Sequence, residues 1–587
     1  MSSKRTTTHT ATRKRVRVAK TSGKRAGTAT YKRGKTRATS GAQSGSKASA
    51  KKVVHPFAGK VVEYLRLIDR EGLATHVENL IEEKSVRSGR PRSFTPRMLL
   101  LGLMLIADEG TMHLSRVVKT LNGLDKESKS RLGLGFTVTR RQVEHLYARI
   151  CEILDSPTVG HAVGPALETV VDARRGDDDL AERFRGFDEF CDKVVEASHQ
   201  KAKKSGSIAV DGTGVESWGT RRTDKDTGEI RVTDTDARWK ARSEDSPWKK
   251  PIFGFDLTVA VQVPDAVDAA ENEQVELFAR SIRFRPATHR PVATGLETLT
   301  AAHSQIRREG GEPGDVLVDR EYTATLDGSG FLNPARALGF DPVFDLKTNQ
   351  LGIRGTVHGA LIIDGQPFSP ATPPDMRLIA APPVNAPTSE KIKYQQKINA
   401  RSSYALVRHG RGLGNGAQDY VCPAHAGKIS CPLSGVVNPL LLPAVHAPAK
   451  AKPGSVCAKK FTRFHAHELP LNQRELYGSF EWMLSMSRRN LVEGFFGNLK
   501  NEATENLKRG SIRVRGLVKT GMMTLFSVVA ANLRLIKNFT PKPRRKARRG
   551  RKPKIGIQVH NPLGNPVGQN DIIDGIGVLD PPEDPFV

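Results

Sequence analysis

The sequence is poor in cysteine and has no long apolar run. Its 587 residues include 5 cysteines, too few for a scaffold held by disulfides and typical of a protein in a reducing cytoplasm. No apolar stretch approaches the ~18 residues of a membrane-spanning helix, and the basic N-terminus lacks the apolar segment of a secretory signal. We therefore expect a cytoplasmic protein with neither a membrane span nor a disulfide framework.

Acidic residues are missing from two long stretches of the chain. Residues 1–52 contain 16 lysines and arginines, residues 537–554 contain 10, and neither stretch has an aspartate or glutamate. These stretches hold 26 of the 30 net positive charges, so the other 517 residues are close to neutral. A near-neutral body with basic arms indicates a polyanionic partner, with nucleic acid, and hence the nucleoid, the first candidate. The simpler alternative is that the arms are solvated tails.

The length and the changes in composition predict several domains rather than one core. Residues 1–52 have almost no apolar side chains to bury and are expected to be disordered. We expect a disordered basic tail over residues 1–55 and a helical DNA-binding domain over 56–172. The first part of an α/β core would follow over 173–350, then an insertion over 351–465 and the second, helical part of the core over 466–540. A basic arm with a disordered tail would cover 541–587.

One helix start in the helical domain has a strong signal. Thr139 and Gln142 predict a capping box. Arg140 and Arg141 would then lie at the exposed start of that helix, as on the recognition helix of a DNA-binding domain. The alternative is an ordinary helix bundle with surface arginines.

From residue 204 the pattern changes from helical to strand-like. Apolar runs predict three strands over 207–210, 253–263 and 276–284, then a helix over 293–308, then two further strands over 315–318 and 342–346. Strands that are followed by a crossover helix and another strand predict a mixed sheet with flanking helices, an α/β (α+β) fold.

Three acidic residues occupy positions suited to binding divalent cations. Asp211 and Asp319 each end an apolar run that is expected to be a buried strand, and Glu493 lies far downstream on an expected helix. Two Mg²⁺ ions that clamp the attacking and leaving oxygens of one phosphate need carboxylates on rigid elements from different parts of the chain. We expect Asp211 to bridge the two ions, with Asp319 holding one and Glu493 the other. Taken singly, each acid could equally be a strand cap or a surface charge.

The helix that carries Glu493 has basic residues on the same face. At about 100° per residue, Met486, Arg489, Glu493 and Lys500 point to one side. Arg489 and Lys500 would grip phosphates beside a scissile bond, Arg bidentately and Lys as a point charge. The alternative is an Arg489–Glu493 ion pair on a solvated face. Trp482 is expected to pack in the core rather than to stack on a flipped base.

This spacing resembles the helix motif of the DDE transposases of bacterial insertion sequences, in their hairpin-forming cut-and-paste group. The motif of that family is Tyr-x2-Arg-x3-Glu-x6-Lys, and this sequence has Met486-x2-Arg489-x3-Glu493-x6-Lys500, with Met at the Tyr position. The blocks Val210-Asp211-Gly-Thr and Val318-Asp319-Arg-Glu-Tyr322 also look like the first two acid blocks of the family. The resemblance covers about residues 204–540.

The resemblance implies a fold, an activity and a set of partners. The fold would be a ribonuclease-H-like mixed sheet with a β-rich insertion before the last catalytic helix. The activity would be cutting and joining of the ends of the protein's own element with Mg²⁺ or Mn²⁺. The partners would be double-stranded DNA, as terminal inverted repeats and target, and further copies of the chain in a dimer or larger synaptic complex. The Tyr of the motif helps to hold the DNA end in the family, so Met486 would have to pack on a base or sugar instead.

A second group of candidate metal ligands lies in the insertion. Within 36 residues the sequence has Cys422, His425, Cys431 and Cys457. These side chains could hold a structural Zn²⁺, with His465 or His467 in place of His425. The spacing matches no standard zinc finger, so buried or free thiols are the favoured alternative.

Other functions fit parts of this sequence. A domesticated DNA-binding protein would keep the basic arms but would not need converging acids. A ribonuclease-H-fold nuclease without strand transfer would need the acids but not the basic helix and the insertion. A histone-like packaging protein would account for the arms alone. The ordered acids together with the helix motif favour the transposase.

Overall fold

The computed structural model describes the chain between its two basic arms. The described residues are 57–84, 92–155, 177–223, 230–240, 251–265, 275–325, 327–383, 385–410, 412, 417–435, 445 and 452–540. The expected tails at 1–55 and 541–587 lie outside these residues. None of the described helices is long and apolar enough to cross a membrane.

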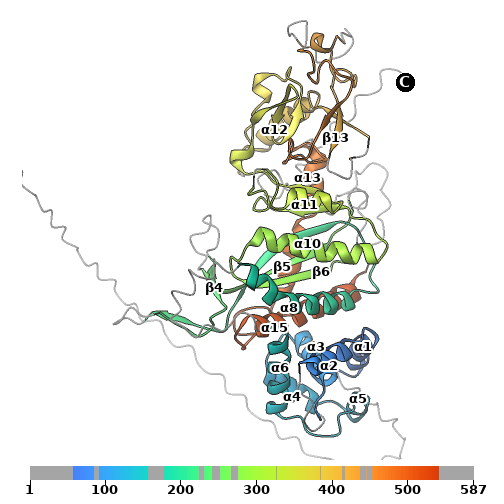
Figure 1. Ribbon diagram of the computed structural model, residues 1–587, viewed down its shortest axis with the longest axis vertical. Helices are drawn as coiled ribbons and strands as arrows, with labels where there is room; N and C mark the ends of the chain where they lie inside the picture. Colours follow the sequence, from blue (N-terminus) through green and yellow to red (C-terminus); the bar gives the residue numbers. More distant parts are fainter. Residues whose placement is uncertain are drawn as a thin grey trace, which may run out of the picture. The chain divides into compact units, whose positions relative to one another are not determined.

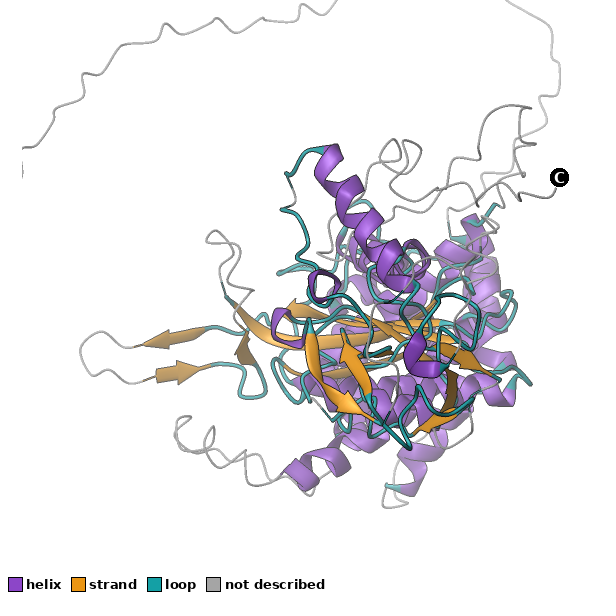
Figure 2. Cartoon of the chain, turned by 90° about the horizontal axis from the view of Figure 1, so that it is seen from above, coloured by secondary structure: helices purple, strands orange, loops and turns teal. Residues whose placement is uncertain are grey.

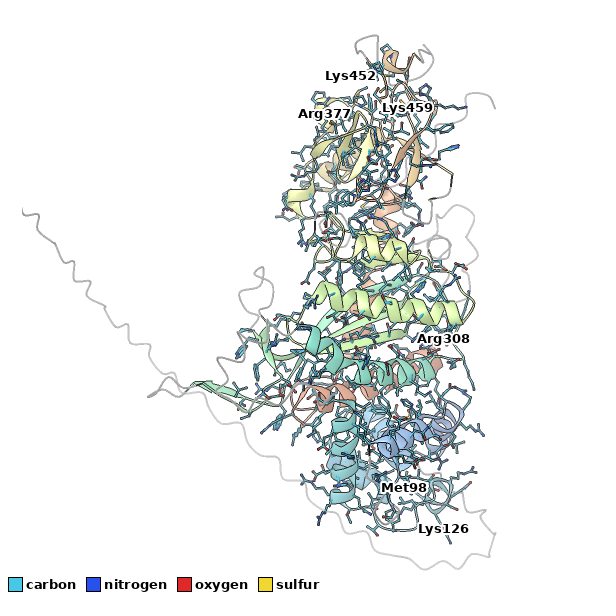
Figure 3. All side chains as sticks on the ribbon, in the orientation of Figure 1. Met98, Lys126, Arg308, Arg377, Lys452 and Lys459 are labelled. Atoms are coloured by element: carbon cyan, nitrogen blue, oxygen red, sulfur yellow. The ribbon has the colours of Figure 1, made fainter. Side chains whose placement is uncertain are left out.

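The first six helices form an all-helical part (Figure 1). They are α1 to α6, over Ala58–Arg70, Leu73–Glu83, Pro96–Asp108, Leu114–Asn122, Lys126–Leu132 and Arg140–Leu154. Helices α1, α2, α4 and α6 pack against α3, whose apolar side chains, including Met98 (Figure 3), are almost all buried. The capping box predicted at the start of α6 is confirmed, because Thr139 and Gln142 each bond to the backbone N–H of the other.

A mixed sheet forms the centre of the next part. Its main strands are β1, β5, β6, β7 and β8, over Ile208–Glu216, Ile252–Gln262, Ala279–Pro286, Asp315–Val318 and Asp341–Phe344. They lie in the order β6-β5-β1-β7-β8, with β5 antiparallel to both neighbours and the remaining pairs parallel. A sixth strand, β4 (Arg238–Lys240), also pairs with β5. This strand order and these directions are those of a ribonuclease-H-type sheet, so the predicted fold class is confirmed.

Helices cover both faces of the sheet (Figure 1). They are α8, α10 and α15, over Asp177–Ser198, Pro291–Arg308 and Leu517–Asn538. Because successive side chains of a strand point to opposite faces, Ala260 of β5 joins the core under α10, while Val259 and Val261 join the core with α8 and α15. Arg308 (labelled in Figure 3), at the end of α10, pairs with Glu196 of α8 at 2.6 Å.

Strand β1 is longer than the sequence predicted. The apolar run ends before Asp211, but the strand continues to Glu216 because β5 pairs with it along its whole length. The parallel neighbour β7 pairs only with Ile208 and Ala209 at its start. Asp211 therefore lies inside β1, just where β1 extends beyond β7, and the expectation that it stands at a strand exit was wrong. Asp319 does follow β7 directly.

The segment between β8 and α13 (Phe480–Ser487) is a β-rich insertion; Figure 2 draws the strands of the chain in orange. It contains two three-stranded antiparallel sheets made of β9 to β14, over Ile353–Val357, Ala360–Ile363, Gln366–Phe368, Val407–His409, Gln418–Val421 and Thr462–Phe464. It also contains a helix that the sequence did not predict, α12 (Thr388–Ser402), because most of its residues are polar and it lacks a broad apolar stripe.

The single helix expected over 486–500 is divided in two. In its place are α13 and α14, over Phe480–Ser487 and Asn490–Lys500. At Arg488 and Arg489 the backbone N–H groups bond to carbonyls three residues back rather than four, which tightens the turn. Met486 and Glu493 therefore belong to different helices.

Candidate active site

Three carboxylates from separate elements meet at one guanidinium group. Arg489 Nη2 lies 3.0 Å from Asp211 Oδ2 and 3.8 Å from Asp319 Oδ2. Arg489 Nη1 lies 2.9 Å from Glu493 Oε1. The structure thus brings together the three candidate catalytic acids, which are 108 and 174 positions apart along the sequence.

The local backbone orients each of these acids. Asp211 Oδ1 accepts a hydrogen bond from the Gly212 N–H at 2.8 Å, and Asp319 Oδ1 accepts one from the Glu321 N–H at 2.8 Å. In both aspartates the other oxygen is therefore the one that faces Arg489. Glu493 lies in the first turn of α14, where the helix dipole favours a negative charge.

The charges of this cluster are strongly coupled. Burial raises the pKa of Asp211 to about 6, and the negative charges of Asp319 and Glu493 act in the same direction, while Arg489 opposes them. Burial alone would lower the pKa of Arg489, but the three carboxylates outweigh it and raise that pKa. The carboxylates therefore stabilise the charged form of Arg489, whose guanidinium in turn offsets part of the effect of burial on the pKa of Asp211.

A buried ion pair joins the two parts of the chain that carry the acids. Arg488 is fully buried and donates to Asp315 Oδ2, the Pro264 carbonyl and the Ser485 carbonyl at 2.5, 2.9 and 3.0 Å. Asp315 begins β7, the strand that leads to Asp319, whereas Arg488 is the residue before Arg489. This pair was missed in the sequence, where Arg488 looks like one more surface cation and Asp315 like a polar strand start. We attribute the break between α13 and α14 to these hydrogen bonds, which hold the Arg488 side chain in the core.

Lys500 lies beside the acids, whereas Met486 and Trp482 pack in or against the core. Lys500 Nζ donates to Thr213 Oγ1, and Thr213 follows Asp211 by two residues on the same face of β1. Lys500 is therefore next to the acid cluster. Met486 is half-buried and packs against the cores on both sides of the sheet, outside the cluster. Trp482 is buried and donates to Gln473 Oε1 at 3.0 Å, which confirms its expected place in the core.

The two arginines expected to read DNA lie far from the acids in the sequence and in a different element. Arg140 and Arg141 occupy the exposed start of α6, as predicted from the capping box. Arg140 forms an exposed ion pair with Glu144 at 2.7 Å, a contact that DNA would have to replace. Base reading by these two residues stays a prediction.

The cysteines of the insertion are buried thiols. Cys422, Cys431 and Cys457 are all buried, while His425 is exposed. A hydrogen bond from Cys457, helped by the backbone N–H groups of Ala424 and His425, lowers the pKa of the Cys422 thiol to about 6. Electrostatic interactions link Cys431 to both Cys422 and Cys457, and a structural zinc site formed by these thiols with His425 stays a prediction.

No preformed metal site is present in the part of the chain that the structure describes. There, no group of three or more His, Cys, Asp or Glu side chains is arranged to hold a metal ion. At the acid cluster Arg489 stands between the carboxylates and occupies the centre. The donor set still fits a divalent cation, because oxygens of Asp211 and Asp319 already surround a single positively charged nitrogen.

Comparison with known proteins finds one distant structural resemblance. No protein-family model matches the sequence, and no curated protein matches it. Among solved structures, the chain is similar to a piggyBac transposase in a synaptic complex with hairpin DNA, with 10% identity and a TM-score of 0.30 over 81% of this chain and 74% of that one. A similarity this distant assigns neither fold nor activity to this chain.

Proposed function

We propose that this protein is a DNA transposase that cuts and joins the ends of its own element by two-metal phosphoryl transfer. The observation that carries the proposal is the convergence of Asp211, Asp319 and Glu493 on one cation from a strand, a strand end and a helix. Acids that served only as strand caps or surface charges would have no reason to share one partner. The ribonuclease-H-type sheet provides rigid supports for two of them.

The proposed chemistry has two steps at one phosphate-binding site. In the first, a water oxygen bonds to phosphorus, the P–O3′ bond breaks, and the departing 3′ oxygen takes up a proton. In the second, that 3′ hydroxyl loses its proton, attacks a target phosphorus and displaces a 3′ oxygen of the target strand. Mg²⁺ or Mn²⁺ bound by the carboxylates would supply positive charge at the reacting phosphate. Asp211 on the central strand, Asp319 and Glu493 are the residues that would hold these ions.

The basic residues of α14 fit the binding of DNA beside the acids. Lys500 and Arg489 lie at the ends of one helix that also carries Glu493, so they can contact phosphates on both sides of the reacting one. The Arg489 side chain is held by carboxylates in this structure and would move to the DNA when a cation takes its place. The further partners we propose are a second copy of the chain and duplex DNA with terminal inverted repeats, in the nucleoid.

The decisive experiment uses the full chain and the DNA that flanks its gene. With Mg²⁺, the wild type should cleave a plasmid that carries these flanks and join the cut 3′ ends to a second plasmid. Glu493→Ala should abolish both reactions and leave DNA binding unchanged, because the carboxylate positions a metal while affinity comes from cations. Glu481→Ala, an exposed acid in the first turn of α13, is the matched control and should keep both reactions.

The outcomes separate the rival functions. Cleavage without joining would support a plain nuclease. Binding without either reaction, in Mg²⁺ and Mn²⁺ alike, would support a domesticated DNA-binding protein. Full activity of Glu493→Ala would remove the catalytic role of the acid cluster.

A further inference from the structure

The loop between α14 and α15 presents a row of arginines beside an exposed tryptophan. Arg509, Arg513 and Arg515 are exposed, and the chain has no acid from residue 506 to residue 540. Trp218, in the segment that follows β1, is 38% exposed. The Arg513 guanidinium lies over the Trp218 ring, 5.2 Å from its centroid. An exposed aromatic ring next to several cations is a common composition of nucleic-acid-binding surfaces.

The backbone of this loop is held in place at both ends and in the middle. The Gly510 carbonyl is 3.0 Å from His113 Nε2, and Ile512 forms a β-bridge with Met112 of the helical part. The Gly516 and Leu517 N–H groups donate to Asp234 Oδ1 and Asp236 Oδ2 at 3.2 and 2.8 Å. The arginines therefore project from a fixed backbone, and little chain ordering would oppose binding.

The arginines of the loop differ from the cations around them in lacking acidic partners. Lys508 is paired with Glu502 at 2.8 Å, and Arg534 is paired with Glu505 at 2.8 Å. In the described part of the chain, no ion pair includes Arg509, Arg513 or Arg515. A solvated surface loop would more often mix both signs of charge. Asp234 and Asp236 bind the backbone at the end of the loop but form no ion pair with the three arginines, whose charge is therefore available to an external anion.

The loop contacts the segment that directly follows β1, the strand that carries Asp211. Trp218 follows Asp211 by seven residues along the direction of β1, and the Lys500–Thr213 contact lies between them. At ~3.3 Å per strand residue, the separation is at most about 23 Å, or up to about seven nucleotide steps of ~3.4 Å. A duplex whose scissile phosphate reached the acids and which followed β1 would pass this loop within one helical turn.

We propose that Trp218, Arg509, Arg513 and Arg515 form a phosphate-contact surface for the duplex DNA that flanks the cut. Arg509, Arg513 and Arg515 bind the phosphates, and Trp218 is a positioning residue that holds the Arg513 guanidinium flat. The contact gives register on the duplex and no base readout. This inference rests on the proposed function, because it takes DNA to be the polyanion at the acid cluster.

The test compares salt dependence of DNA binding in two triple variants of the full chain. In the first, Arg509, Arg513 and Arg515 are all replaced by Ala. In the second, the matched control, the same charge is removed at the opposite end of β1, by replacing the exposed Lys201, Lys203 and Arg307 with Ala. Affinity for a 30-base-pair duplex of arbitrary sequence is measured by fluorescence anisotropy at several salt concentrations, and circular dichroism melting confirms that each variant is folded.

We expect the loop variant to lose at least tenfold in affinity and the slope of log K against log salt to flatten by about 2–3, since each lost phosphate contact removes about 0.9. The control should keep the wild-type slope. Trp218→Ala should lose part of the affinity, and Trp218→Phe, which keeps an aromatic face, should restore it.

Three results would contradict the inference. If the wild type binds duplex DNA and the loop variant behaves like the control, this surface is not a DNA contact, although the proposed function stands. If the wild type binds no DNA at all, the proposed function fails and the inference with it. If the loop variant keeps its duplex affinity and loses affinity only for a 30-nucleotide single-stranded RNA measured in the same assay, the partner of the loop is RNA and the inference is overturned.

Discussion

Arg489 Nη2 lies 3.0 Å from Asp211 Oδ2, although 278 residues separate the two in sequence. The guanidinium has the position that a bound cation would take, because Asp319 and Glu493 also face it. Its Nε is buried and has no hydrogen-bond partner, so the side chain is not fully satisfied there. We interpret Arg489 as a cation that holds the acids together until a metal and DNA arrive.

This interpretation predicts the effect of Arg489 on metal binding. Arg489→Ala should bind Mn²⁺ at least tenfold more tightly than the wild type in titration calorimetry without DNA, because the positive charge that competes for the carboxylates is gone. Arg463→Ala, which removes an arginine paired with Asp419 in the insertion, is the control and should bind Mn²⁺ as the wild type does. Equal affinity in all three proteins would show that Arg489 does not compete with metal.

Lys500 should matter for DNA and not for metal. Lys500→Ala should weaken binding to duplex DNA and reduce the salt slope by about 0.9, the loss of one phosphate contact, while Mn²⁺ affinity stays the same. Lys508→Ala removes a lysine that is paired with Glu502 beyond the end of the same helix and serves as the comparison. A loss of metal binding in Lys500→Ala would mean that the lysine instead shapes the acid cluster.

The buried Arg488–Asp315 pair should be a major source of stability. Arg488→Met keeps most of the side-chain volume but leaves Asp315 with Arg474 as its remaining cationic partner. Removing one partner of a buried pair costs about 3–5 kcal/mol, so the free energy of unfolding of the core in urea should fall by about 3 kcal/mol. The exposed Arg463→Met should leave it unchanged. An equally small effect of both variants would contradict a structural role for Arg488.

His199 should make the stability of the protein depend on pH. It is buried against Phe278 with a ring-centroid distance of 4.6 Å, and burial holds its pKa well below the usual 6.5. Below about pH 6.5 the unfolded chain takes up a proton that the folded chain excludes, so stability should decrease as pH falls from about 7.5 to 5.5. The contribution is at most about 1.4 kcal/mol per pH unit. His199→Gln should show a shallower dependence than the wild type, and the exposed His425→Gln should not.

The periodicity of the sequence was sufficient for the class of fold. Alternating and continuous apolar runs predicted the five main strands and α10, and the bounds of all but β1 to within a few residues, because the two faces of this sheet are both buried by helices. Short elements were not predicted, because they contribute little to a buried apolar face. The apolar pattern is too short to predict strands of three residues, such as β2 (Arg221–Thr223) and β3 (Ile230–Val232), and too weak to predict the polar helix α12.

The sequence by itself determined which residues are acidic, which are basic and how they are spaced, and this was enough to select Asp211, Asp319, Glu493, Arg489 and Lys500 as one candidate group. Only the tertiary structure decided that Arg489 lies at the centre of the acids. It also decided that β1 continues through Asp211, because β5 pairs with it, and that the helix breaks at Arg488, because Asp315 draws that side chain into the core. Hydrogen bonds and ion pairs between segments that lie tens to hundreds of residues apart set these features, and no local pattern contains them.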